Sequence, residues 1–107
     1  TFKLKTKAGV TTLATVYTVP SSTTAIVLGL VIGNTTSGAI TSTITLSSDT
    51  SDTETNADVE IITNAAIPAN SSLEVMGGNK IVMQTTDLIR VFGSAAVDVT
   101  LSIMEIT

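Results

Sequence analysis

The sequence predicts an all-β fold, an antiparallel β-sandwich of about seven to eight strands in a jelly-roll- or Ig-like arrangement. Three observations support this prediction. β-Branched residues dominate the composition, and branching at Cβ suits a pleated, half-buried strand. Apolar and polar residues alternate in several segments, and turn-forming residues separate these segments at short intervals. No helical apolar period follows a capping box.

The chain has 107 residues, which is enough for one hydrophobic core, so we expect a single domain over 1–107. Residues 1–8, where Phe2 and Leu4 alternate with lysines, are either a first strand or an extended N-terminal arm. Charged residues make up only 13% of the chain, and Thr and Ser supply the polar surface instead. Either these hydroxyl side chains keep the surface soluble, or a partner covers part of it.

Turn-forming residues divide the chain into strand segments. Pro20 ends one segment because proline has no N–H to donate to a β-ladder, and Gly77-Gly78-Asn79 predicts a tight hairpin because glycine adopts positive φ readily. The polar run 47–56 predicts a surface loop. Besides the N-terminal segment 2–7, we expect strands at 11–19, 24–32, 40–46, 58–63, 72–76, 80–84, 88–92 and 97–107.

The last segment alternates cleanly over most of its length. Val97, Val99, Leu101 and Ile103 share one face, and polar residues take the other. The alternation of residue types breaks at Met104-Glu105-Ile106. We interpret this break as a β-bulge or a change of neighbouring strand near the end of the segment.

The segment Ala25–Ile32 is apolar on both faces, whereas an antiparallel strand with one wet face alternates. Strict alternation places four large side chains in the core: Ile26, Leu28, Leu30 and Ile32. The opposite face is small and flat, which suits close approach by a second protein surface. The alternative is that a loop or the N-terminal arm covers this face internally. The predicted interface consists of Ala25, Val27, Gly29 and Val31, together with Phe2 and Leu4 of the arm.

The sequence offers little for catalysis. It has no cysteine and no histidine, which excludes disulfides, thiolate chemistry, and the commonest general base and metal ligand. We therefore expect no enzyme activity and no catalytic, cofactor-binding or metal-binding residues. The acidic side chains near 49–58 lack the spacing of a calcium-binding EF-hand loop, so a solvated loop is the favoured interpretation: Asp49, Asp52, Glu54 and Asp58.

The charge and hydropathy patterns also exclude classes of partner. The net charge is −4, and no basic cluster exists beyond Lys3, Lys5 and Lys7, which argues against nucleic-acid binding. No apolar run reaches the length of about 18 residues that a membrane-spanning helix needs. The expected partner is therefore another protein surface. Closed symmetry is usual among homo-oligomers, so a homotrimer or another cyclic oligomer is the simplest form of self-association.

Four turn-and-strand segments resemble the small β-sandwich virion structural proteins of tailed bacteriophages: Val19–Leu30, Ala66–Val75, Thr86–Val91 and Val97–Ile106. Asn70 and Thr86 stand where glycine is common in those proteins. The resemblance implies a virion component, made in the host cytoplasm, that binds copies of itself and other virion proteins such as the major capsid protein. Capsid decoration (cement) is the expected role, and neck, collar or tail-fibre structure is the alternative.

A binding module for carbohydrate or a host receptor is the rival class of function. Such a module needs exposed aromatic or acidic groups in its loops, and the 47–56 loop is the one candidate in this sequence.

Overall fold

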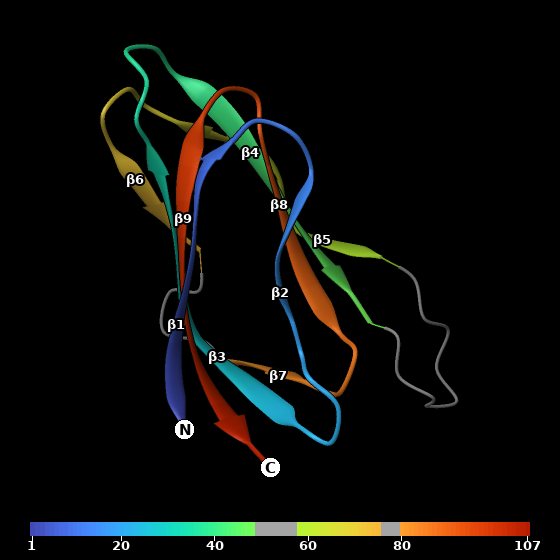
Figure 1. Cartoon of the computed structure of the whole chain (residues 1–107). Helices are drawn as coiled ribbons and strands as arrows, with labels where there is room; N and C mark the ends of the chain where they lie inside the picture. Colours follow the sequence, from blue (N-terminus) through green and yellow to red (C-terminus); the bar gives the residue numbers. More distant parts are fainter. Residues whose placement is uncertain (49–57, 76–79) are drawn as a thin grey trace.

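The computed structural model describes residues 1–48, 58–75 and 80–107, which form two antiparallel sheets packed face to face (Figure 1). Sheet A has the order β1-β9-β3-β6, and β7 also pairs with β3; sheet B has the order β2-β8-β4-β5. The nine strands of the described residues are β1 (Phe2–Val10), β2 (Ala14–Thr18), β3 (Thr24–Asn34), β4 (Ile40–Ser47), β5 (Val59–Ile67), β6 (Ser72–Glu74), β7 (Ile81–Met83), β8 (Leu88–Gly93) and β9 (Val97–Ile106).

The predicted β-sandwich is confirmed, and one of its predicted strand connections differs. The N-terminal segment pairs with β9 over most of its length and is therefore a full strand of sheet A. The predicted hairpin between segments 72–76 and 80–84 is wrong. Its turn, 77–79, lies outside the described residues, but β6 and β7 each pair with β3, at Val31–Gly33 and Ala25–Val27 respectively, and not with each other.

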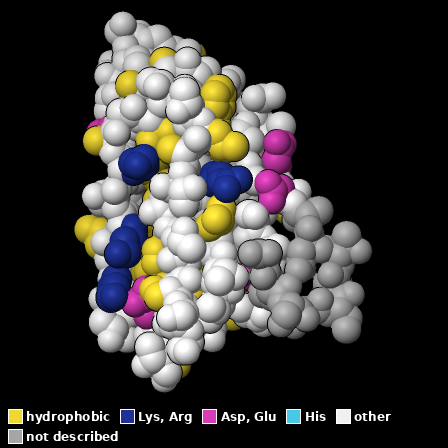
Figure 2. All heavy atoms as spheres, turned by 45° about the vertical axis from the view of Figure 1, so that its right-hand side comes forward, with side chains coloured by type: hydrophobic (Ala, Val, Ile, Leu, Met, Phe, Trp, Pro, Cys, Tyr) yellow, Lys and Arg dark blue, Asp and Glu magenta, His cyan; other side chains and the backbone are white. Residues whose placement is uncertain are grey.

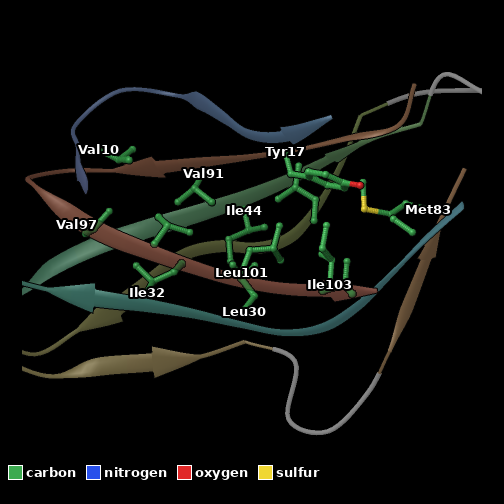
Figure 3. Packing of buried hydrophobic residues seen from close by; sticks show 14 of the residues in the cluster. Val10, Tyr17, Leu30, Ile32, Ile44, Met83, Val91, Val97, Leu101 and Ile103 are labelled. Carbon is green, nitrogen blue, oxygen red and sulfur yellow. The ribbon is translucent and has the colours of Figure 1, made fainter. Parts of the chain in front are cut away.

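In the part of the chain that the structure describes, no helix is long and apolar enough to cross a membrane. The core lies between the sheets, where apolar side chains from both inner faces meet (Figure 3). Leu30 and Leu101 from sheet A and Ile44 and Val91 from sheet B are fully buried. Burial of such side chains is the main stabilising contribution, about 1.5–3 kcal/mol for each large aliphatic side chain.

A buried asparagine ties the loops together at one end of the sandwich. Asn34, at the end of β3, donates from Nδ2 to the carbonyls of Gly38, Ile67 and Pro68 at 2.9–3.0 Å, and its Oδ1 accepts from the Thr36 N–H at 2.9 Å. Its side chain is therefore fully satisfied although it is only 3% exposed. This network holds the β3–β4 connection against the end of β5 in sheet B.

A β-bulge in β3 decides which of its side chains enter the core. Val27 lies opposite Ile103 of β9, whereas Gly29 lies opposite Ser102, so Leu28 is an extra residue in the ladder. A bulge shifts the alternation of faces by one position. The buried residues are consequently Ala25 and Val27 before the bulge, and Leu30 and Ile32 after it.

This bulge corrects the predicted faces of the strand. Ala25 and Val27, predicted as interface residues, have no exposed surface and belong to the core. Ile26, predicted as core, lies opposite Met104 on the other face, and neither residue packs against the core cluster. The side chains of Ala25–Ile32 do not alternate strictly, because the extra residue Leu28 exchanges the inner and outer faces for the rest of the strand.

The predicted irregularity at the end of β9 is also wrong. Burial alternates without interruption from Val97 to Ile106, and the pairs with β1 and β3 stay in register there. Glu105 takes the inward position that the alternation assigns to it and is only 8% exposed. The side chain changes from apolar to charged at Glu105, but the backbone of β9 continues without a bulge.

Stability measurements on two neighbouring valines test the position of the bulge. Val27→Asp should lower the free energy of unfolding by on the order of 3–5 kcal/mol, because it leaves an unpaired charge in the core. Val31→Asp should cost less than about 1 kcal/mol, because Val31 is 37% exposed on the outer side of the same strand. Urea denaturation of both variants measures this difference. Equal losses would contradict the bulge.

Candidate functional site

An apolar row crosses the outer face of sheet A, the face turned away from sheet B. Phe2 of β1 lies opposite Met104 of β9, Met104 lies opposite Ile26 of β3, and Ile26 lies opposite Val82 of β7. Residues directly opposite in a ladder project to the same face, so these four side chains form one continuous line. Phe2 is 74% exposed and Val82 is 63% exposed. We call these four residues the apolar row.

More apolar side chains lie beside this row. Leu4, two positions along β1, is 63% exposed, and Ile106, two positions along β9, is 49% exposed. Leu28, the extra residue of the bulge, is half-buried, and Val31 follows on the outer face. Single exposed apolar residues are normal on a protein surface, but a contiguous set across four strands marks a surface for interaction.

The structure brings together four of the six predicted interface residues. Phe2, Leu4, Gly29 and Val31 all lie on the outer face of sheet A, where Leu4 and Gly29 are both opposite Ser102. Ala25 and Val27 lie on the inner face, as described above. The sequence pattern missed Ile26, Met104 and Val82. Each of the three is a large apolar residue, which is a signal that the sequence contains. Only the pairing of the strands shows that they form a row.

A polar cluster lies on the inner side of β1, the side that faces sheet B and is opposite to the apolar row. The Tyr17 hydroxyl of β2 donates to Glu105 Oε2 at 2.5 Å, and Lys3 Nζ lies 2.8 Å from Glu105 Oε1. Lys5 Nζ lies 5.9 Å from the centre of the Tyr17 ring, within the range of a cation–π contact. In Figure 2, Lys and Arg side chains follow one another along the left edge of the surface, and an acidic group lies beside them.

The electrostatics of this cluster are those of a structural contact. The Lys3 ammonium, followed by the Tyr17 hydroxyl, holds the pKa of Glu105 below its ordinary value, so Glu105 is charged at neutral pH. Burial, followed by the hydrogen bond to Glu105, raises the pKa of Tyr17, so its hydroxyl stays protonated. A carboxylate that is charged at neutral pH and a phenol that is protonated at neutral pH do not form an acid–base pair that can exchange protons near pH 7.

An open hollow of about 250 Å³ lies on the outer face of sheet B. Its lining is mixed: Leu13, Thr43, Thr45, Glu60 and Phe92. One phenyl ring does not make the stacking platform that sugar recognition uses, so this hollow favours no ligand class. Most of the predicted 47–56 loop, from residue 49 onward, lies outside the described residues. Among the described residues, no three acidic side chains gather as a set of metal ligands.

Comparison of the chain with family models, with curated proteins and with solved structures found no match. The candidate site therefore rests on the geometry of the chain itself. The feature that stands out is the apolar outer face of sheet A with the β1 strand at its edge.

The pH dependence of stability tests the Glu105 cluster. Because the folded state lowers the pKa of Glu105 from its ordinary 4.5, the unfolded state binds the proton more readily, and this contribution to stability is lost as the pH falls below about 4.5. Glu105→Gln should be less stable than the wild type at pH 7, and the difference should shrink in acid. Chemical denaturation from pH 7 to pH 3 measures it.

Glu74→Gln is the matched control for this series, because it removes one negative charge at an exposed position of β6. A stability difference between wild type and Glu105→Gln that stays constant from neutral to acid pH would show that the carboxylate charge is not what holds the cluster.

Proposed function

We propose that this chain is a structural protein that acts by assembly, through the apolar outer face of sheet A. The observation that carries this proposal is the apolar row: Phe2, Met104, Ile26 and Val82. Together with the resemblance in its turn-and-strand segments, this surface supports a role as a bacteriophage virion component. Within the virion, we propose capsid decoration, in which identical copies bind each other and the shell and so stabilise the particle.

The energetics of this surface favour burial against a partner. Transfer of Phe2, Leu4 and Val82 out of water contributes on the order of 1–2 kcal/mol each, because each is more than half exposed. Association costs several kcal/mol in lost translational and rotational freedom. These three side chains alone therefore do not hold two copies together, and the half-buried residues around them must contribute as well. Repetition of the contact around a closed ring or over a shell multiplies the gain.

The edge of sheet A favours docking through its face. β1 forms one edge of sheet A, and β6 and β7 form the other. The side chains that β1 turns toward sheet B are Lys3, Lys5 and Lys7. Lysines on an edge strand discourage the addition of a further strand, because two such edges repel each other. The outer face carries Phe2 and Leu4 and no such charge on β1. Docking of a partner on the outer face is therefore favoured over pairing of a further strand with the β1 edge.

Two substitutions on the outer face and one matched control test this proposal. Leu4→Asp and Val82→Asp place a charge on the apolar surface and should reduce self-association at least tenfold, since a buried, unpaired charge opposes assembly. Val59→Asp makes the same change on β5 of sheet B, where Val59 is 58% exposed, and should leave assembly unchanged. Sedimentation velocity over a concentration series measures the association.

A wild-type chain that stays monomeric at the highest soluble concentration would remove self-assembly from the proposal. Wild-type-like association of Leu4→Asp and Val82→Asp would move the interface away from sheet A.

The place of the protein in a particle is a separate question. Capsid decoration requires that this chain be as abundant as the shell subunits, whereas a neck or tail protein forms only one or a few rings. Quantitative mass spectrometry of purified particles that contain this chain measures the ratio. We expect a ratio in the range of the shell subunits, and a much smaller ratio would favour the neck or tail.

A further inference from the structure

We propose that the β1 arm, Phe2–Gly9, is exchanged between copies of this chain, so that the arm of one copy pairs with β9 of another. This inference rests on the proposed assembly role and names its partner and its mechanism. The arm contributes almost nothing to the core. Apart from Lys5, which is half-buried, every residue from Phe2 to Gly9 is exposed, and burial begins only at Val10.

The contacts that hold the arm all have their second partner on the body of the molecule. Main-chain pairing runs from Phe2 opposite Met104 to Lys7 opposite Val99. Lys3 forms its ion pair with Glu105, and Lys5 lies over the ring of Tyr17. Because no contact within the arm itself has to be broken, the arm of a second copy can make the same set of contacts. Exchange of an identical element is a low-cost route to an oligomer for this reason.

The charges of the arm and of its binding site are complementary. Residues 1–9 carry three of the five basic residues of the chain and none of its nine acidic residues. The groups that receive the arm on β9 are carboxylates: Glu105 binds Lys3 at 2.8 Å, and Asp98 Oδ1 accepts the Gly9 N–H at 3.0 Å. A positively charged arm is therefore attracted to β9 of any copy, and two detached arms repel each other.

The joint between arm and body is well defined. The ladder slips between Lys7 and Val10, so Ala8 and Gly9 together lie opposite Asp98, and Gly9 has φ +66°, the left-handed region that glycine adopts without strain. Val10 beyond this bulge is fixed in the core, and a Cβ added at Gly93 would lie only 2.8 Å from the Val10 carbonyl oxygen. The body thus holds Val10 tightly, and a change of direction at Gly9 releases the arm.

Engineered cysteines can show whether the arm binds β9 of its own copy or β9 of another copy. The chain has no cysteine of its own, so no native thiol interferes. Thr1 and Glu105 exchange both main-chain hydrogen bonds, at 2.7 and 2.8 Å, so the pair Leu4–Ser102 three positions further along is of the type without such bonds. Its Cα atoms are then about 4.5 Å apart, which permits a disulfide. Both side chains lie on the outer face, where substitution leaves the core intact.

The test mixes two single variants of different mass tag, Leu4→Cys and Ser102→Cys, unfolds them together, refolds them and oxidises them. Exchange predicts a disulfide between the two chains. The control mixture pairs Leu4→Cys with Val82→Cys. Val82 is 63% exposed on the same face but lies opposite Ile26 and not opposite the arm. This mixture should give at least tenfold less cross-linked product. Equal yields in the two mixtures, or a higher yield with Val82→Cys, would overturn exchange in favour of contact between intact faces.

A locked chain separates this inference from the proposed function. In the double variant Leu4→Cys/Ser102→Cys, oxidised at high dilution, the disulfide holds each arm on its own β9. Sedimentation velocity should then show loss of association that a reductant restores. Association that is unaffected by the lock would overturn arm exchange and leave assembly through the face of sheet A intact. A wild-type chain that never associates would overturn both.

Discussion

The β-bulge at Leu28 lies in β3, the strand that pairs with three others in sheet A, and the assignment of side chains to core and surface depends on it. Before the bulge, Ala25 and Val27 point into the core, and after it Leu30 and Ile32 do so. Without the extra residue, Ile26 would point inward and the apolar row would not exist. One inserted residue thus produces both a complete core and an apolar outer face.

The polar cluster behind β1 follows from a second constraint, the shortage of apolar side chains at this side of the sandwich. β1 offers lysines to the inner side, and β9 offers Glu105 at its last inward position. The buried charge of Glu105 is tolerated because the carboxylate has both the Lys3 ammonium and the Tyr17 hydroxyl as partners. The arm is consequently held by ladder hydrogen bonds and charge, with no contribution from a packed core.

These two features meet at Phe2 and Leu4. They stand on the arm, and they extend the apolar surface that begins at Ile26 and Val82. In the proposed assembly, movement of the arm would therefore change the surface offered to a second copy, and a copy bound there would hold the arm in place.

The sequence by itself determined the fold class, most strand positions, and the prediction that β3 meets a partner or cover on its second face. These follow from local residue type: β-branched alternation, Pro and Gly breaks, and an unbroken apolar run. It could not determine the phase of β3 or the role of Glu105. Gly29 beside the bulge is a residue that bulges favour, but the apolar residues on both faces of this strand leave the phase open. A glutamate in a strand resembles an irregularity until its partners Lys3 and Tyr17 are known. The apolar row required the pairing of four strands distant in sequence, which only the tertiary structure decides, because cross-strand register is a long-range property.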